Sequence, residues 1–588
     1  MDASMHDRLI WRTSTVYPRI PYIFCGGSQE DGKVFRLGNR SELWQFLDRT
    51  EPPQRESVTV CNLARVLAMT STVQETAPPG VATPKIILGL IILYFVSYPI
   101  YALYLHPLRD YPGGIFTRIS RIPYWIACIQ GKQVKFMTEQ HRKYGPTVRF
   151  APNDLSYTES QAWRDICLIP KGKKENGKEL KFHPLSANGV PNLITEPSPV
   201  RHATVRRVFS SAFSEKALKQ QEPLFQKYAD LMVARGRRKG TVNMAELLNF
   251  TTFDIMAEFA FGESLGLLEK DAYSDWVATV FNTLTVLPVV QFIQFYWLPR
   301  TLFGLLEPKA VQKMRLDHFN HTVSRVDKRL KDGSTKPDLW NLVEESGVLT
   351  SEEVYNNAEL FMTAGTETTG QLANYAQTSR SGTANCGIAS LLTGTTYYLL
   401  KNPDKLNILT DEIRGRFKSN EEMTFESLGK LEYLNACLRE GLRVYPSIPT
   451  AIPREVADGG NVIMGKWLPG GIRVSVHQTA TYRSPANFRN PDEYVPERWL
   501  GDPSYKDDIR EAHQPFGVGT RNCIGMNTKL IFNFDMRTEV DASWRDQSVF
   551  VIWDHFEQRT LGTYDSYMRL YLTSEALVQS RWLATECS

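Results

Sequence analysis

The sequence predicts a globular domain that is held at a membrane by one transmembrane helix. Residues 86–105 read IILGLIILYFVSYPIYALYL, twenty residues without a charge. At ~1.5 Å per residue, such a helix spans roughly 30 Å, the thickness of the hydrocarbon core of a bilayer. The chain as a whole has an ordinary globular composition, since 42% of its residues are hydrophobic and 22% are charged. A buried core helix is the alternative, but the segment is apolar on every side and ends at the Pro/Gly-rich stretch HPLRDYPGG.

The charges around this segment predict its orientation. Arg109, Arg118 and Arg121 follow it, so the positive-inside rule places the bulk of the chain on the cytoplasmic side. Residues 1–68 disagree, because they carry nine Lys/Arg before the span, and they also lack a sustained periodicity. We therefore interpret residues 1–68 as a non-native N-terminal extension. Residues 69–85 begin with Met69, hold few charges and suit a short lumenal lead.

Charge and cysteine usage exclude two classes of protein. The 68 Lys+Arg and 64 Asp+Glu residues give a net charge of +4 without a basic tract, so a nucleic-acid binder is not expected. The eight cysteines form no CxxC pair and stand beside no histidine cluster. This argues against a disulfide framework or a zinc site and favours reduced, cytosol-facing thiols.

A single cysteine lies between glycines in residues 514–527, which read QPFGVGTRNCIGMN. Backbone N–H groups at a helix N-terminus stabilise a thiolate, and CIGMN can begin such a helix. The glycines let the chain fold tightly beneath a flat ligand. Arg521 can pair with an anionic substituent, and Phe516 can shield the sulfur from water. A glycine-rich surface loop with a free cysteine is the alternative.

This stretch resembles the haem-binding loop of the cytochrome P-450 family. The shared pattern is F-G-x-G-x-R-x-C-x-G, and its fixed positions are Phe516, Gly517, Gly519, Arg521, Cys523 and Gly525. In that family the cysteine thiolate is the axial ligand of the haem iron and favours O–O cleavage. The resemblance implies that Cys523 binds the iron of haem b.

The resemblance extends over roughly residues 69–553. The phrases YLLKNPDKL and YRSPANFRNPDEYVPERWL are similar to filamentous-fungal members of secondary metabolism, such as averantin and isotrichodermin hydroxylases. It implies a mainly α (α+β) fold, with one helical haem domain and small β-sheets, preceded by a single transmembrane helix. Residues 106–553 are expected to form the haem domain, and residues 554–588 an aberrant C-terminal tail.

Two further motifs of the family follow the same chain order. Glu440 and Arg443 lie three residues apart on a helical pattern, and Arg498 stands in a turn bracketed by prolines. They resemble the family's Glu–Arg–Arg network, which implies a structural role, because a buried carboxylate shared by two guanidiniums needs all three partners. Upstream, residues 358–370 read AELFMTAGTETTG and resemble the family's distal helix. The resemblance implies that Glu367 and Thr368 relay protons through water; a solvated helix cap is the alternative.

Cations for the haem propionates are also implied by the resemblance. His202 and Arg206 lie one helical turn apart at a position that faces the haem edge in related fungal enzymes. Arg454 resembles the family's propionate-binding arginine after the Glu–Arg helix. A solvated basic helix face or strand end is the alternative for each of them.

The chain departs from the family pattern in three places. Residues 370–388 insert nineteen residues, three of them glycine, into one long apolar helix, and we interpret them as a retained intron or an insert. After Asn527 about three helical turns of the family pattern are missing, and Lys529 stands where an alanine is expected. Residues 554–588 lack the expected Pro-containing apolar strand.

We therefore expect a haem-thiolate monooxygenase that inserts one oxygen atom from O2 into an apolar small molecule, a polyketide or a terpenoid. Electrons are expected from NADPH through NADPH–cytochrome P-450 reductase. The expected location is the endoplasmic reticulum membrane, single-pass in membrane lipid, with the catalytic domain cytoplasmic. A non-functional product of a mis-spliced gene is one alternative. Haem-dependent isomerase or dehydratase chemistry is another, and the Glu367–Thr368 pair argues against it. The apolar residues 283–299 are either a substrate-access element or plain core.

Overall fold

The computed structural model describes residues 82–366 with short gaps, residues 387–528, and two short strands at 550–553 and 570–573. The gaps lie at 170–171, 173, 183–187, 240–241, 307–308, 333–339, 341–342 and 344–345. The chain divides into two compact units, Met1–Ile92 and Leu93–Ser588. All features of the functional site lie in the second unit.

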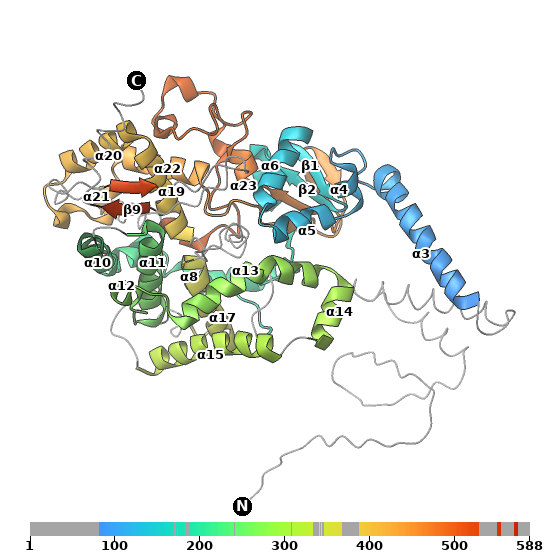
Figure 1. Cartoon of the computed structure of the whole chain (residues 1–588), viewed down its shortest axis with the longest axis horizontal. Helices are drawn as coiled ribbons and strands as arrows, with labels where there is room; N and C mark the ends of the chain where they lie inside the picture. The colour runs from blue at the N-terminus through green and yellow to red at the C-terminus, as the bar shows by residue number, and fades with distance from the viewer. Residues whose placement is uncertain are drawn as a thin grey trace, which may run out of the picture. The chain divides into compact units, whose positions relative to one another are not determined.

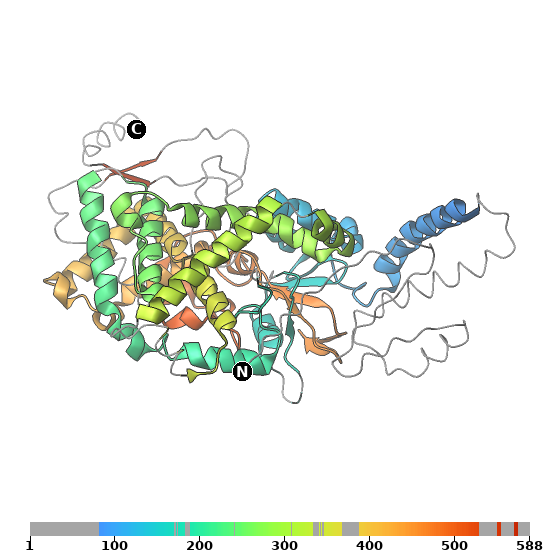
Figure 2. The ribbon, with the colours of Figure 1, turned by 90° about the horizontal axis from the view of Figure 1, so that it is seen from below.

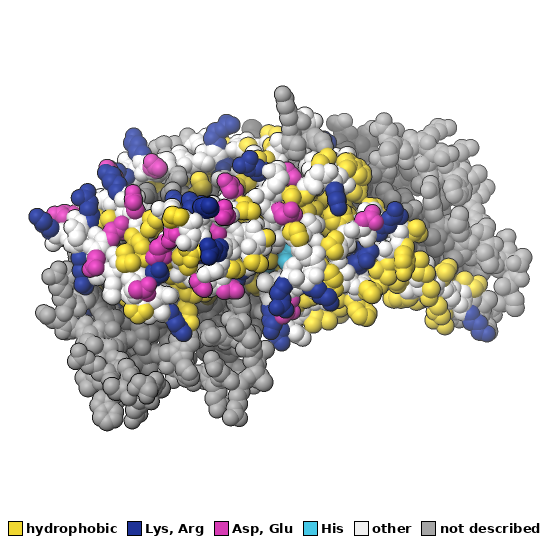
Figure 3. Space-filling view, turned by 90° about the horizontal axis from the view of Figure 1, so that it is seen from above, with side chains coloured by type: hydrophobic (Ala, Val, Ile, Leu, Met, Phe, Trp, Pro, Cys, Tyr) yellow, Lys and Arg dark blue, Asp and Glu magenta, His cyan; other side chains and the backbone are white. Residues whose placement is uncertain are grey.

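The apolar N-terminal segment is helical. The helix α3 (Ala82–Ile100) contains Pro99 and continues into a π-helical turn, η2 (Tyr101–Leu105). Among the described residues, one helical stretch is long and apolar enough to cross a membrane, and it covers Lys85–Leu105. Figure 3 shows its apolar side chains in yellow on the surface. Length and composition therefore agree with the predicted span at residues 86–105.

The helical part of the second unit is built around α11 (Met244–Phe261), in which nearly every side chain is buried. The Asn243 side chain accepts a hydrogen bond from the Glu246 N–H at its start, and Gly262 ends it at a φ of 73° in the left-handed region that glycine favours. The helix contacts α10 (Glu222–Lys239), α17 (Ser351–Thr366) and α19 (Gly387–Lys401) (Figure 1). Such all-round burial identifies α11 as a central core helix.

The other helices surround this core or lie beside the sheet. The α-helices are α4 (Ile115–Ile119), α5 (Ile122–Ile129), α6 (Gln133–Tyr144), α7 (Ser160–Cys167), α8 (Pro199–Ser210), α9 (Glu215–Gln220), α12 (Leu267–Lys270), α13 (Asp275–Phe295), α14 (Trp297–Leu306), α15 (Lys309–Asp332), α20 (Pro403–Arg416), α21 (Phe425–Leu428), α22 (Glu432–Val444) and α23 (Gln478–Tyr482). The short 3-10 helices are η3 (Asn420–Glu422), η4 (Pro496–Trp499), η5 (Pro503–Tyr505), η6 (Arg510–Ala512) and η7 (Ile524–Thr528).

A five-stranded sheet has the order β1-β2-β7-β4-β3. Its strands are β1 (Thr147–Ala151), β2 (Asp154–Tyr157), β3 (Gly177–Lys178), β4 (Arg454–Glu455) and β7 (Arg473–Val476). Only the β2–β7 pair is parallel, so segments from both halves of the chain meet in this sheet. Figure 2 shows its cyan and orange strands side by side. The edge pair β3–β4 matters most here, because it lies beside the functional site.

Two small hairpins complete the described strands. They are β5 (Asn461–Ile463) with β6 (Lys466–Leu468), and β8 (Phe550–Trp553) with β9 (Leu570–Thr573). The prediction of a mainly helical domain with small sheets is confirmed. The strand β9 lies inside residues 554–588, the tail that lacks the Pro-containing apolar strand of the family pattern, and it contains no proline. Of the predicted insert 370–388, the described part is the first two residues of α19, Gly387 and Ile388.

Candidate functional site

The cysteine stretch folds into a tight loop that two backbone hydrogen bonds close. The Cys523 N–H donates to the Phe516 carbonyl oxygen at 2.8 Å, and the Asn522 N–H donates to the Gly519 carbonyl oxygen at 3.2 Å. Gly517 and Gly519 have φ values of 68° and 84°. Side chains disfavour this left-handed region, so the loop geometry explains both glycines.

Close packing adds a second reason for the glycine at 519. A Cβ atom on Gly519 would lie 2.3 Å from the carbonyl oxygen of Cys167, the last residue of α7. The Phe516 ring packs against the main hydrophobic core, and Val518 packs against the cluster that contains the sheet. The loop is therefore fixed between the two halves of the domain.

Opposing influences act on the charge of the Cys523 thiol. Its side chain is accessible to solvent, yet burial by surrounding atoms raises the thiol pKa above its ordinary value. The Gly525 N–H and the Arg206 guanidinium act in the opposite direction and favour the thiolate. A ligand can therefore reach the exposed sulfur, and the Gly525 N–H and Arg206 favour the thiolate that would bind it.

Arg206 braces the loop directly. It lies on α8, which begins with Ser198 as N-cap and Pro199 in the first turn. Its Nη1 donates to the Asn522 carbonyl oxygen and its Nη2 to the Asn522 Oδ1, both at 2.7 Å. The sequence pattern predicted Arg206 at the haem edge, and the structure places its guanidinium on the residue before the cysteine.

Arg521 is engaged by protein groups on three sides. Its Nε lies 3.1 Å from Oε1 of Glu175, and both side chains are buried. Its Nη1 donates to the Glu196 carbonyl oxygen at 2.7 Å, and its Nη2 to the Pro197 carbonyl oxygen at 3.3 Å. The predicted anion partner of Arg521 is therefore, in this structure, a carboxylate of the chain itself.

His202 and Arg454 lie in the same cationic region. Burial and the nearby Arg521 and Arg206 lower the pKa of His202 to about 4, so the imidazole is neutral at physiological pH. Arg454 is 6% exposed, and its Nη1 is buried without a hydrogen-bond partner among the described residues. Lys178 faces Arg454 across the β3–β4 pair, and its pKa is lowered to about 7, first by burial and then by Arg454 and Arg521.

These observations test whether the residues fit a haem group. A haem needs an axial ligand, and the solvent-accessible Cys523 sulfur, with the Gly525 N–H and Arg206 favouring its thiolate, can supply one. Its two propionate carboxylates need cations, and the region beside the loop holds buried positive charge with an unpartnered guanidinium nitrogen on Arg454. Both requirements are met by residues that lie within one region of the fold, so the site fits the group.

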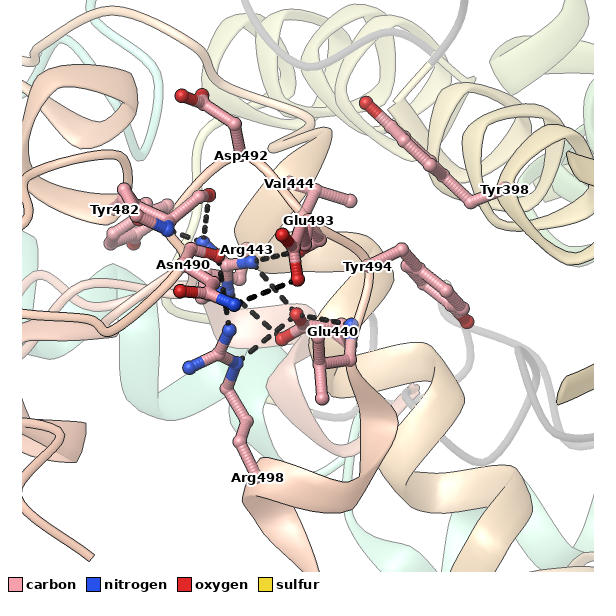
Figure 4. A network of polar contacts seen from close by, with 12 residues as sticks. Tyr398, Glu440, Arg443, Val444, Tyr482, Asn490, Asp492, Glu493, Tyr494 and Arg498 are labelled. Carbon is pink, nitrogen blue, oxygen red and sulfur yellow. Dashed lines mark hydrogen bonds and ion pairs between the residues drawn. The ribbon is translucent and has the colours of Figure 1, made fainter. Parts of the chain in front are cut away.

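Glu440 and Arg443 of α22 form one fully buried network with Arg498 (Figure 4). Arg443 donates to both oxygens of Glu440, from Nη2 to Oε1 at 2.7 Å and from Nε to Oε2 at 2.9 Å. Arg498 donates from Nε to the same Oε1 at 3.1 Å. The sequence pattern predicted that these three residues meet. It missed Asp508, which forms a second ion pair with Arg498, and Trp499, whose Nε1 donates to Glu440 at 2.9 Å.

The proposed proton-relay residues Glu367 and Thr368 lie outside the described residues, which reach Thr366 at the end of α17. The apolar segment 283–299 forms the second half of α13 and the start of α14. The rings of Phe292 and Phe295 lie 6.0 Å and 5.7 Å from that of Trp125 on α5. These contacts show that the segment contributes to a hydrophobic cluster, whichever other role it has.

Sequence reasoning also missed Glu175 and Lys178. Both lie in a stretch rich in lysine and glutamate, which reads as a solvated surface segment. Only the two-residue strand β3, with its partner β4 far along the chain, brings them to the loop. No local pattern in the sequence signals that pairing.

Comparison with known proteins places the chain in one family. The Cytochrome P-450 family model matches residues 117–375 and 388–528. The cytochrome P-450 monooxygenase FUM2 of Gibberella moniliformis is 39% identical over 477 residues, which is 77% of this chain and 97% of that protein. The monooxygenase efuB of Hormonema carpetanum is 36% identical over 79% of this chain and 93% of its own length. Averantin hydroxylase of Dothistroma septosporum is 35% identical over 79% of this chain and 89% of its own length. The chain therefore belongs to the cytochrome P-450 family and is an oxidoreductase, like the monooxygenases to which it is similar.

Proposed function

We propose that this chain is a membrane-anchored haem-thiolate monooxygenase of fungal secondary metabolism that acts on an apolar small molecule. The observation that carries the proposal is the loop around Cys523. The loop has two left-handed glycines and a close approach to α7, and the Gly525 N–H and the Arg206 guanidinium act on its one accessible sulfur. A free surface cysteine needs none of these features.

Cys523 is the proposed axial ligand of the haem iron. When bound, a haem with an axial thiolate supplies the activation of O2 and the insertion of one oxygen atom into the substrate. Phe516, packed on the core beside the loop, shields the sulfur from water. The Gly525 N–H and Arg206 hold negative charge on the sulfur and so keep it competent to bind the metal.

Glu367 and Thr368 are the proposed proton carriers. A carboxyl group next to a hydroxyl can pass protons through water from the protein surface to the reacting centre. Glu440, Arg443 and Arg498 are proposed to act as a structural brace, because they are completely buried and far from solvent. His202, Arg206, Arg454 and Arg521 are the proposed residues of the cationic haem edge.

The redox partner and the membrane location are proposed from the family and from the apolar helix α3. We propose that electrons come from NADPH through NADPH–cytochrome P-450 reductase. We also propose that Lys85–Leu105 anchors the chain in the endoplasmic reticulum membrane, with the catalytic domain on the cytoplasmic side; its length and composition support this. The named substrates of the relatives belong to those proteins. For this chain an apolar polyketide or terpenoid is proposed.

The axial-ligand assignment is tested with a reduced carbon monoxide spectrum. The parent chain is expected to show the red-shifted Soret band of a thiolate-bound haem, and Cys523→Ala is expected to lose it. Cys167→Ala is the matched control, because this cysteine lies next to the loop but is not the proposed ligand. A red-shifted band that survives Cys523→Ala contradicts the assignment.

A further inference from the structure

Three ring side chains connect the cysteine loop to solvent through direct contacts. The Tyr482 hydroxyl oxygen accepts a hydrogen bond at 3.1 Å from the N–H of Gln514, the first residue of the cysteine stretch. The ring centroid of Tyr482 lies 4.9 Å from that of His513, which in turn lies 5.1 Å from that of Trp499. Tyr482 is completely buried, whereas Trp499 is partly exposed. The contacts therefore lead from the loop to an indole that solvent reaches.

The first two rings cannot easily hold the positive charge that follows the loss of an electron. A phenol gives up an electron readily only when its proton leaves too, and the Tyr482 hydroxyl donates to an amide oxygen, Oε1 of Gln478, at 3.3 Å. An amide oxygen is a very weak base, and burial also raises the pKa of Tyr482. Burial and nearby arginines lower the pKa of His513 to about 3, so this imidazole stays neutral. Tyr482 and His513 can thus pass an electron on by contact without keeping the charge.

Trp499 can hold that charge. Indole is the most readily oxidised ring among the protein side chains, and Nε1 of Trp499 donates to Oε2 of Glu440 at 2.9 Å. A carboxylate in contact stabilises an adjacent cation. The guanidiniums of Arg443 and Arg498 share Glu440, but Arg498 also pairs with Asp508, so these four side-chain charges sum to zero. The oxidised indole therefore meets a carboxylate inside a network without net charge.

We propose that Trp499 is the point at which electrons from a small soluble reductant, ascorbate, enter the chain, and that they reach the haem site through His513 and Tyr482. The inference rests on the proposed function. It adds a second activity to the monooxygenase, in which hydrogen peroxide is reduced at the haem site when no substrate is bound. Such an activity protects the loop and the haem from oxidative damage.

The electrons and protons of this reaction balance. One hydrogen peroxide takes up two electrons and two protons at the haem site and leaves as two water molecules. Trp499 supplies the electrons one at a time. In each turn the indole loses one electron, keeps its Nε1 proton in the hydrogen bond to Glu440, and regains an electron from one ascorbate anion. Two ascorbate anions thereby become two monodehydroascorbate radicals and release the two protons.

The first test maps oxidation in the parent chain and needs no variant. The full chain, loaded with haem, is treated with hydrogen peroxide in the absence of substrate, with and without ascorbate. Peptide mass spectrometry then measures oxygen addition at each tryptophan, and Soret absorbance measures loss of haem. Trp467 of β6 and Trp297 of α14 are internal controls, because they are 61% and 74% exposed. Without ascorbate we expect oxidation to concentrate at Trp499, and ascorbate should suppress both this oxidation and the loss of haem.

The second test removes the indole. Trp499→Phe should lose most of the ascorbate-dependent consumption of peroxide, and its Soret band should bleach faster. Trp467→Phe is the matched control and should behave as the parent. The reduced carbon monoxide spectrum and thermal unfolding, both measured before peroxide is added, show whether each variant folds as the parent does. If Trp499→Phe does not fold, because Glu440 has lost a hydrogen-bond donor, the oxidation map of the parent decides alone.

Two results overturn the inference. One is oxidation that follows exposure, with Trp297 and Trp467 oxidised before Trp499. The other is a Trp499→Phe variant that folds as the parent does and consumes peroxide with ascorbate at the parent rate. If either occurs while the parent shows the thiolate spectrum, this inference fails and the proposed function stands. If the parent shows no thiolate spectrum, the proposed function fails with it.

Discussion

Glu440 shows at the scale of one residue how a buried charge is tolerated. Its carboxylate accepts hydrogen bonds from two guanidiniums, from the Trp499 indole and from the Val495 N–H at 2.8 Å. Every lone pair that burial removes from water is thereby satisfied. Arg443 donates its other protons to backbone carbonyls of Tyr482, Pro491 and Glu493. The network therefore ties α22 to the irregular chain after it.

Removing this carboxylate should be costly. Glu440→Gln leaves the Arg443 guanidinium buried without its counter-ion, and we expect the free energy of unfolding to fall by about 3–5 kcal/mol. Asp492→Asn is the control, because Asp492 pairs with Arg483 while its own side chain is 76% exposed. That change should cost about 0–1 kcal/mol. Urea denaturation followed by circular dichroism compares them; similar losses in both variants would contradict the structural role.

Thr368 is the residue on which the proposed proton relay depends most directly. Thr368→Ala should retain haem and substrate binding but divert electrons to hydrogen peroxide, because proton delivery is impaired and O2 binding is not. The measurement is the ratio of product, hydrogen peroxide and NADPH consumed. Thr369→Ala is the matched control at the next position. Unchanged coupling in Thr368→Ala would refute the role given to this hydroxyl.

At the scale of single residues, the sequence pattern selects residues that a short motif contains. Cys523 with its glycines, and Glu440 with Arg443, each lie within ten residues of their motif partners. Asp508 was missed, although its carboxylate completes the partner set of Arg498. The chain between them follows irregular turns and 3-10 helices, whose geometry has no sequence period from which a contact can be read.

At the scale of elements, the cysteine loop can be recognised from the sequence, whereas the β3–β4 pair cannot. The glycines make the loop recognisable in the sequence, because the left-handed backbone and the close packing both exclude other side chains. The strands β3 and β4 have two residues each and pair across more than half of the chain. Strands this short carry no alternation, so the sequence alone does not reveal them.

The two glycines of the loop should differ in how they tolerate alanine. Both have a positive φ, which costs roughly 1–2 kcal/mol for any other residue. Only Gly519 also lacks space, since its Cβ would clash with the Cys167 carbonyl oxygen, whereas the nearest atom to a Cβ on Gly517 is 4.0 Å away. Gly519→Ala should therefore lose far more haem than Gly517→Ala. Haem content per purified chain decides this, and equal losses would mean that backbone strain alone sets the requirement.

At the scale of the whole molecule, the chain and its family diverge in the middle and after the cysteine loop. The family match is interrupted between residues 375 and 388 and ends at residue 528. The first interruption falls inside residues 370–388, which the sequence pattern predicted to be an insert. The second coincides with the predicted loss of a proximal helix after Asn527. Both remain predictions about the natural transcript.

Deletion of residues 370–388 tests the first of them. A helix interior loses up to ~1 kcal/mol per glycine, and three glycines in one segment are a sizeable part of a stability of roughly 5–15 kcal/mol. We expect the deletion to raise haem occupancy in part, and restoring the proximal helix as well to raise it further. Removing nineteen residues from 1–68 is the length-matched control. Stoichiometric haem with a stable thiolate spectrum in the full 588-residue chain would show that the insert is accommodated.

The opposed cations of β3 and β4 have one more consequence, which concerns protons. Lys178 has its pKa lowered from 10.5 to about 7, so without haem the unfolded chain binds more protons than the folded chain between these values. The stability of the haem-free protein should therefore rise with pH through this window and be lowest below about pH 7, as far as Lys178 is concerned. The groups that face it are Arg454, Arg521, His202, Cys167 and Glu175.

Lys178 stands opposite Arg454, a proposed residue of the haem edge, so a carboxylate that binds Arg454 should raise the pKa of Lys178 and haem binding should draw a proton from solution above about pH 7. The affinity for haem should consequently fall as the pH rises above about 7. Calorimetry of haem uptake in buffers of different ionisation enthalpy measures the protons bound, and Lys178→Gln should abolish that uptake while Lys174→Gln retains it. Proton uptake that persists in Lys178→Gln would assign it to another group. Lys178 would then become fully charged only when haem binds. The local pH would therefore set how readily the chain takes up its cofactor.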